Sequence, residues 1–142
     1  MSDPSIRDNN GRREVFDPVR KRFVALTPEE WVRQQMIIFL HEQRQYPLEL
    51  MQVEGAITLN GLTKRCDIVL YGRDAHPQMI VECKKPDVPI NQKVLDQASR
   101  YNLTLRVPYL CLTNGRQLVV LKVDFAARKL MPLPEVPDWK TL

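Results

Sequence analysis

The amino-acid sequence predicts an α/β domain in which two helices pack on a mixed β-sheet, in the order α-β-β-β-α-β-β. Two stretches with helical patterning, at residues 28–45 and 92–103, are separated by short apolar stretches that are typical of strands. The 142 residues are 44% hydrophobic and 27% charged, which is typical of a single soluble globular domain. Helices and strands in this order are expected to form layers around one core.

The chain before the first predicted helix is polar and then briefly apolar. Residues 1–14 are mostly polar, and we expect this N-terminus to be flexible. Apolar stretches at 15–16 and 23–26 lie on either side of Asp17 and Pro18. They predict a small hairpin or an extended arm.

The first helix has the clearest start signal. Thr27 is suited to the N-cap position, Pro28 to the first helical position and Glu30 to the third, which together make a capping box. Because the apolar stripe of this helix is broad, we expect it to be covered on more than one side. The stripe consists of Val32, Met36, Ile37, Ile38, Phe39 and Leu40.

Three strands are predicted after the first helix, at residues 49–58, 65–71 and 78–84. The second helix, at 92–103, follows Asn91, a residue type that is favoured as an N-cap.

Two further strands, at 109–113 and 118–123, are joined by a turn at 114–115. Residues 124–142 contain Pro132, Pro134 and Pro137, and we expect them to form an extended tail.

Charge, hydropathy and cysteine content narrow the class of protein. The net charge of +4 is only a mild indication of an anionic partner. The chain has neither a secretory signal nor an apolar run long enough for a membrane span, so we expect a cytoplasmic protein. Its three cysteines, Cys66, Cys83 and Cys111, fall on separate predicted strands without a C-x-x-C pair, which argues against zinc and for buried, reduced thiols.

Charged side chains interrupt two of the apolar strands. Asp67 lies in the strand at 65–71, and Glu82 and Lys84 lie in the next one. Alternation places Asp67, Val69 and Tyr71 on one face of their strand, and Glu82 and Lys84 with Ile80 on one face of theirs. Burying such ions without partners costs several kcal/mol or more, so they must satisfy one another or hold a ligand.

A hairpin between these strands would bring the two acids together. A symmetric turn at 72–77 places Asp67 opposite Glu82, with Cβ atoms about 4.5–5.5 Å apart. Two carboxylates that close repel each other unless a cation lies between them. One interpretation is therefore a divalent metal site in which Lys84 supports charge on a phosphate. The other is a structural ion pair between Lys84 and one of the acids.

The order of these residues resembles the PD-(D/E)xK nuclease superfamily. More narrowly, the chain resembles the N-terminal nuclease domain of type I restriction-enzyme restriction subunits over about residues 15–123. This resemblance implies a restriction-endonuclease-like mixed sheet with flanking helices. The motifs that carry it are PEEWVRQ at 28–34, CDIV at 66–69, VECKKP at 81–86, DQASRYN at 96–102, VPY at 107–109 and TNG at 113–115.

The resemblance assigns roles to four charged residues. Asp67 and Glu82 match the metal-binding acids of the superfamily, and Lys84 matches its catalytic lysine. Glu30 matches an acidic residue of the first helix that can complete the metal site. Its capping-box role remains an equal alternative.

The resemblance also covers a Gln-x-x-x-Tyr motif in the second helix. Gln97 and Tyr101 are four residues apart and therefore share one helical face. The family match implies that they contact DNA or its phosphates. The alternative is that Tyr101 belongs to an apolar stripe with Val94 and Ala98.

Taken together, the resemblance implies a Mg²⁺-dependent DNA endonuclease domain, with Mn²⁺ able to replace Mg²⁺. Its expected partners are DNA, the subunits of a restriction-modification system and a second copy of the chain, because one active centre cuts one strand. The alternative is a non-catalytic DNA-binding or assembly module that retains the fold. Type I restriction subunits also carry an ATP-driven motor, but none of the five glycines here begins a G-x-x-x-x-G-K-[ST] loop. We therefore expect either a stand-alone nuclease or a subunit that depends on partners.

Overall fold

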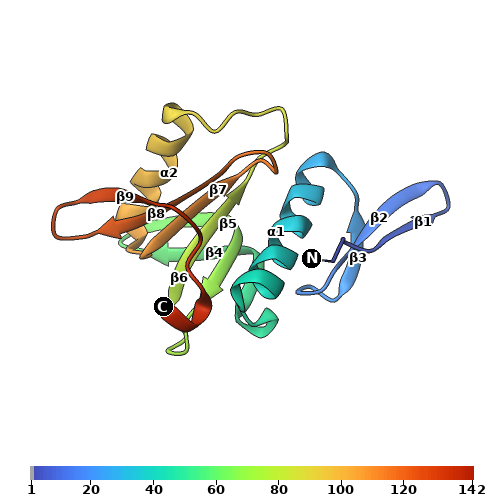
Figure 1. The fold of residues 1–142 in the computed structure, drawn as a ribbon, viewed down its shortest axis with the longest axis horizontal. Helices are drawn as coiled ribbons and strands as arrows, with labels where there is room; N and C mark the ends of the chain where they lie inside the picture. Colours follow the sequence, from blue (N-terminus) through green and yellow to red (C-terminus); the bar gives the residue numbers. More distant parts are fainter. Residues whose placement is uncertain (1) are drawn as a thin grey trace.

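The computed structural model describes residues 2–142, which form two β-sheets, two α-helices and two short 3₁₀ turns (Figure 1). A small antiparallel sheet precedes the first helix, and a larger sheet follows it. The elements are β1 (Ile6–Asn9), β2 (Arg12–Asp17), β3 (Arg22–Ala25), α1 (Pro28–Arg44), η1 (Leu48–Leu50), β4 (Met51–Leu59), β5 (Leu62–Tyr71), β6 (Pro77–Cys83), α2 (Gln92–Leu105), β7 (Tyr109–Thr113), β8 (Leu118–Asp124), β9 (Lys129–Leu133) and η2 (Trp139–Thr141).

The larger sheet has the strand order β4-β5-β6-β7-β8-β9. Strands β6 and β7 are parallel, whereas the other neighbouring strands are antiparallel. A parallel pair needs a crossover connection, and α2 provides it. This mixed sheet with its two helices confirms the predicted α/β fold.

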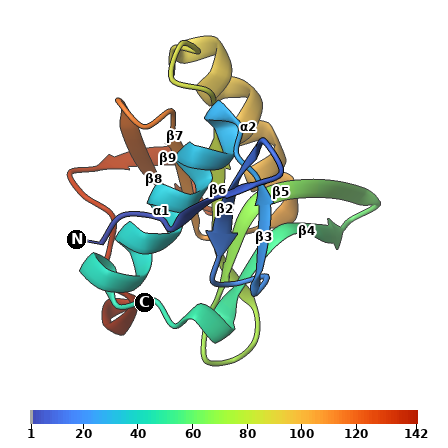
Figure 2. The same ribbon diagram turned by 90° about the vertical axis from the view of Figure 1, so that its right-hand side faces the viewer.

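The two helices cover opposite faces of the larger sheet, so the core has three layers (Figure 2). In β6, Met79 and Val81 pack in the cluster beneath α1, whereas Ile80 packs in the cluster beneath α2. A central strand that is covered on both faces is apolar on both, which explains its nearly continuous hydrophobic sequence. The three cysteines are buried and unpaired within the described residues, as predicted.

The start of α1 agrees with the predicted cap in one half only. The Thr27 side chain accepts a hydrogen bond of 3.0 Å from the backbone N–H of Glu30. The reciprocal bond of a capping box is replaced, because the Glu30 carboxylate accepts from Arg20, Arg33 and Gln34. The Glu30 carboxylate therefore binds side chains of α1 and of the segment before it, instead of capping the helix.

Both ends of the chain contain more regular structure than the sequence pattern indicated. Residues 6–9, in the stretch expected to be flexible, form β1 and pair with β2. Residues 129–133, in the stretch expected to be a tail, form β9 at the edge of the larger sheet. Pro132 fits there because an edge strand does not need every backbone N–H for pairing.

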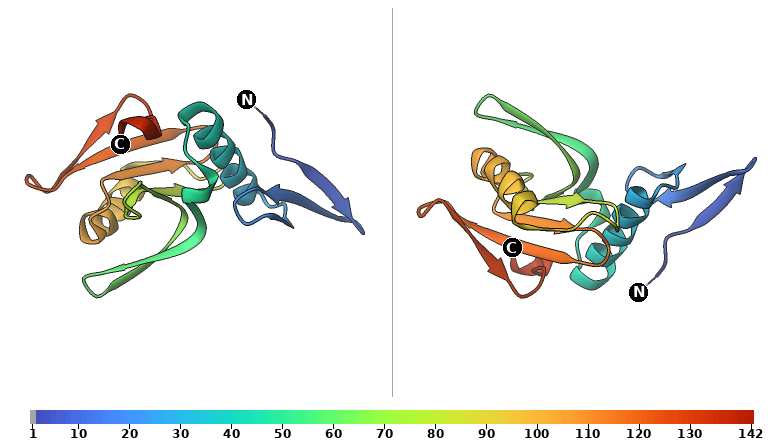
Figure 3. Two further views of the ribbon diagram at one scale, coloured as in Figure 1. Left: turned by 90° about the horizontal axis from the view of Figure 1, so that it is seen from below. Right: turned by 90° about the horizontal axis from the view of Figure 1, so that it is seen from above.

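The β4–β5 hairpin curls out of the plane of the sheet and reaches α2 (Figure 3). At its tip, the Asn60 amide donates a 3.2 Å hydrogen bond to the carbonyl of Thr104 in α2. Ile57 and Leu62 of the hairpin pack in the same cluster as α2. The curl therefore brings β5 residues near the tip to the α2 side of the sheet.

The alternation of β5 breaks where the curl begins. Cys66 and Val69 both belong to the α2-side cluster, whereas Ile68 belongs to the α1-side cluster. In the neighbouring strand β4, Glu54 has a left-handed φ of 56°, which is a strained conformation for a residue with a side chain. Strict alternation, from which we placed Asp67 on the face of Val69, is therefore interrupted between Cys66 and Ile68.

Neither helix within residues 2–142 is long and apolar enough to cross a bilayer.

Candidate active site

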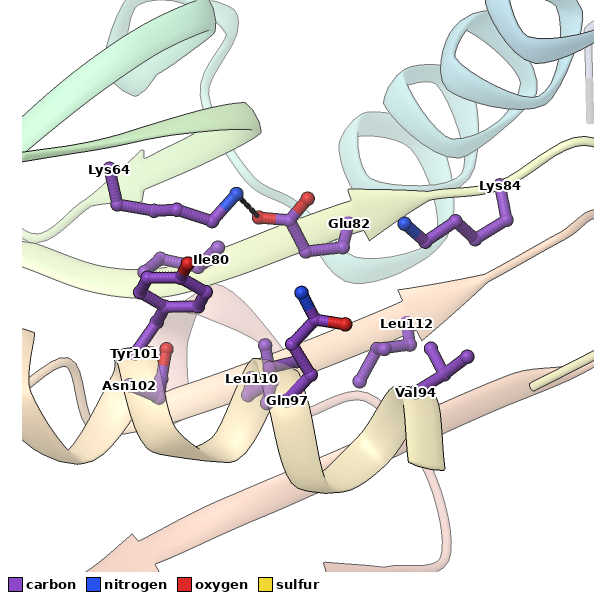
Figure 4. A pocket seen from close by; sticks show the side chains of 11 residues that line it. Lys64, Ile80, Glu82, Lys84, Val94, Gln97, Tyr101, Asn102, Leu110 and Leu112 are labelled. Carbon is purple, nitrogen blue, oxygen red and sulfur yellow. Dashed lines mark ion pairs between the residues drawn. The ribbon is translucent and has the colours of Figure 1, made fainter. Parts of the chain in front are cut away.

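A cavity of about 100 Å³ lies between α2 and the strands β6 and β7 (Figure 4). Four of the six predicted site residues line it, namely Glu82, Lys84, Gln97 and Tyr101. The apolar part of its wall is formed by Ile80, Val94, Ala98, Leu110 and Leu112.

The β6 side of the cavity follows from strand alternation. Ile80, Glu82 and Lys84 all line it, as the period of two predicts. Beyond the end of β6, the backbone N–H of Lys84 donates a 2.8 Å hydrogen bond to the carbonyl of Thr113. This bond continues the contact with β7 and fixes the backbone from which the lysine side chain projects.

Glu82 is a charged group of the cavity whose hydrogen bonding is incomplete. Its Oε1 is buried and has no hydrogen-bond partner within residues 2–142. Burial raises the pKa of Glu82 to about 7; the positive charge of Lys64 opposes this rise and the negative charge of Asp67 adds to it. The nearest cation is the Nζ of Lys64, 3.5 Å from Oε1.

Asp67 joins β6 to α1. Its Oδ2 accepts a 2.8 Å hydrogen bond from the backbone N–H of Cys83, and its Oδ1 accepts one of 2.9 Å from Arg33. The hairpin has the predicted register, with Ile68 opposite Val81. Asp67 directly precedes Ile68 in β5, and Glu82 directly follows Val81 in β6. The two acids are therefore close neighbours on adjacent strands.

Glu30 lies outside the cavity, in an ion-pair cluster on the α1 side. Arg33 donates a hydrogen bond of 2.8 Å to Glu30 Oε1 and another of 2.9 Å to Asp67 Oδ1. One guanidinium therefore bridges these two acids. Arg20 adds a 3.0 Å bond to Glu30 and a 2.6 Å bond to the buried Asp17. The structure thus links Glu30 to Asp67 through Arg33.

Comparison with known families identifies this chain. The model of the type I restriction enzyme R protein N terminus (HsdR) matches residues 28–137. The chain belongs to this family.

Two solved structures resemble the HsdR N-terminal domain described here. One is the fragment structure of a proposed HsdR subunit from Vibrio vulnificus, with 21% identity and a TM-score of 0.55 over 81% of this chain and 24% of that one. The other is a proposed nuclease of the DUF820 group from Anabaena variabilis, with 11% identity and a TM-score of 0.54 over 99% and 87% of the two chains. At these identities the likeness supports the fold. No curated protein matches the chain.

The acids of this HsdR domain fit a magnesium ion by their chemistry. Mg²⁺ is usually bound by one or two carboxylates together with water, and Glu82 offers a buried oxygen without a hydrogen bond beside Asp67. Within residues 2–142, no three Asp, Glu, His or Cys side chains gather in a group that could hold a metal. A site with two carboxylates suits Mg²⁺ better than an ion that needs a full protein cage.

Sequence reasoning missed two cations of the site, Arg33 and Lys64. Arg33 lies three residues after Glu30 on one helix, a spacing at which opposite charges meet, and this signal was available. Lys64 reaches the cavity only because the hairpin curls toward α2. The alternation of residues along a flat strand does not predict that Lys64 lies in the cavity.

Proposed function

We propose that this HsdR N-terminal domain hydrolyses phosphodiester bonds of DNA with the help of Mg²⁺. The observation that supports this most directly is Glu82, a buried carboxylate with an unbonded oxygen beside Asp67 and Lys84. A buried anion with an unsatisfied oxygen is costly, and a bound divalent cation removes that cost. Membership of a restriction-enzyme family supports DNA as the substrate and restriction-modification subunits as partners.

The cavity residues Glu82, Lys84, Gln97 and Tyr101, together with the neighbouring Asp67, each have a role in this proposal. Asp67 and Glu82 would hold the metal, which when bound activates a water molecule and neutralises charge on the phosphate. Lys84 places a positive charge where negative charge develops on the phosphate in the transition state. Gln97 and Tyr101 donate hydrogen bonds to phosphate or sugar oxygens and position the DNA backbone. Glu30 would complete the metal site only after release of Arg33, because its carboxylate is bound by Arg20, Arg33 and Gln34.

Incubation with supercoiled plasmid tests the proposal. We expect nicking with Mg²⁺ or Mn²⁺ and none with EDTA. Glu82→Gln and Lys84→Met should each lower the rate by about 100-fold or more. Lys85→Met is the matched control, because Lys85 is the exposed neighbour of Lys84 and does not line the cavity. Nicking that persists in Lys84→Met would show that another site, or a contaminant, does the cutting.

A second candidate is a non-catalytic DNA-binding or assembly module. It is favoured by the way protein cations already face the acids, with Arg33 on Asp67 and Lys64 on Glu82. Such a module would bind DNA equally well with EDTA and with Mg²⁺, and Glu82→Gln would leave its affinity unchanged. Fluorescence anisotropy with a labelled duplex measures both quantities.

A further inference from the structure

Lys64 is a second lysine of the candidate site. Its Nζ lies 3.5 Å from Glu82 Oε1, donates a 2.9 Å hydrogen bond to the carbonyl of Arg65 and sits 5.3 Å from the centre of the Tyr101 ring. Figure 4 shows Lys64 and Lys84 directed toward Glu82 from opposite sides. Glu82 is therefore flanked by one ammonium group from the residue that follows its own strand and one from the curled hairpin.

Lys64 faces the buried oxygen of Glu82 that we assign to the metal. The contact is an ion pair without a hydrogen bond, since Oε1 lacks a hydrogen-bond partner within the described residues. A Mg²⁺ ion would approach a carboxylate oxygen to about 2.1 Å. Two cations cannot share one buried oxygen at such distances without strong repulsion. Metal binding at Glu82 should therefore displace the Lys64 ammonium.

A displaced Lys64 has both the freedom and the surroundings to take a new anionic partner. Its side chain is 28% exposed, compared with 14% for Glu82. The ring of Tyr101 attracts the ammonium and keeps it at the wall of the cavity. Tyr101 is also a residue that we assign to the DNA backbone, so a phosphate held there would be within reach of Lys64.

We propose that Lys64 alternates between two partners: Glu82 in the metal-free protein, and a phosphate of the bound DNA strand once the metal occupies Glu82. This inference rests on the proposed function. Lys64 then prevents an unpaired anion in the empty site and adds a phosphate contact in the loaded one. Its removal should have opposite effects on the two ligands, strengthening metal binding and weakening DNA binding.

The experiment measures both ligands on the full chain. Mn²⁺ binding by calorimetry should be about 10-fold tighter in Lys64→Met than in the wild type, because a competing cation is gone. Binding of a phosphorothioate duplex in the presence of Mn²⁺ should be about 10-fold weaker, with a salt dependence shallower by roughly one phosphate contact. Lys64→Arg keeps the charge and should retain wild-type metal affinity. Lys85→Met should match the wild type in both assays, and circular dichroism checks folding.

The outcomes separate this inference from the proposed function. Equal Mn²⁺ affinity in the wild type and Lys64→Met would overturn the competition at Glu82 and leave the metal site intact. Tighter Mn²⁺ binding with unchanged DNA affinity would overturn the phosphate contact. If neither protein binds Mn²⁺, both the metal site and this inference are wrong.

Discussion

Two neighbouring carboxylates, Glu82 and Asp67, lie in opposite environments. Asp67 accepts hydrogen bonds at both oxygens, from Arg33 and from the Cys83 backbone. Glu82 has a buried oxygen without a hydrogen bond within residues 2–142 and a pKa raised to about 7. Substitution of these two acids by their amides is therefore expected to change stability in opposite directions.

In the metal-free protein, Glu82 should make stability fall as pH rises. Its pKa of about 7 in the folded state exceeds its ordinary value of 4.5, so at a pH between these two values the folded state keeps a proton that the unfolded state has lost. The contribution is fully present below pH 4.5 and is lost as pH rises through 7. Its size is on the order of 3 kcal/mol. The charged groups that act on it are Lys64, Asp67 and Lys84.

Urea unfolding with EDTA at pH 5 and pH 8 measures this effect. Glu82→Gln should be more stable than the wild type at pH 8 and should show a smaller difference between the two pH values. Added Mg²⁺ should stabilise the wild type at pH 8 and leave Glu82→Gln unchanged. An identical pH dependence in both proteins would mean that Glu82 is not the group responsible.

Asp67→Asn should lower the free energy of unfolding by about 3 kcal/mol, because it leaves the buried Arg33 without one of its anions. Glu54→Gln is the control, since Glu54 is 41% exposed and 3.7 Å from Arg33, and should cost less than about 1 kcal/mol. Urea unfolding with EDTA gives both values. A stabilised Asp67→Asn protein would show that repulsion from Glu82 outweighs the bond to Arg33.

At the scale of elements, α2 carries the part of the site that would contact DNA. Gln97 and Tyr101 lie on its cavity face, and Figure 4 shows both side chains directed toward the strand that bears Glu82. Val94 and Ala98 share this face, so the helix presents an apolar wall with two polar groups on it. The predicted contact with DNA and the predicted packing role are therefore compatible in space.

Tyr101→Phe separates these two roles, because it removes the hydroxyl and keeps the ring. We expect Tyr101→Phe and Gln97→Ala to lower DNA cleavage by about 10-fold while Mn²⁺ affinity and the urea midpoint stay close to wild type. Gln92→Ala, at the exposed start of the same helix, serves as the control. Full cleavage activity in Tyr101→Phe would leave packing as the role of this residue.

The sequence predicted the central elements well because their signals are local. The cap at Thr27 and the register of Ile68 opposite Val81 both depend on residues that are close together in the sequence. Strand β9 depends instead on pairing with β8, and Lys64 reaches the cavity through the curl of a hairpin. Interactions that depend on partners distant in the chain leave no periodic pattern in the sequence.

At the scale of the whole molecule, the proposed nuclease site has a single pair of acids, Asp67 and Glu82, and would therefore make one cut per binding event. Cleavage of both DNA strands then requires two copies of the chain or repeated binding. We expect a homodimer, measured as a doubled mass by light scattering at micromolar concentration. If the protein is a homodimer, linear plasmid should appear at the same time as nicked plasmid. A monomeric mass would contradict the homodimer and favour sequential nicking.

The parallel pairing of β6 and β7 has a consequence for folding kinetics. The other neighbouring strands of the larger sheet are antiparallel, but β6 and β7 meet only after the segment of residues 84–108 has closed. Closing a long segment costs entropy before the new contacts form, so this docking is expected to be the slow phase of refolding. Glu82 lies on β6 and Gln97 lies within the closing segment. The ability to bind metal and DNA together should therefore appear with the slowest refolding phase, after most of the hairpin structure has already formed.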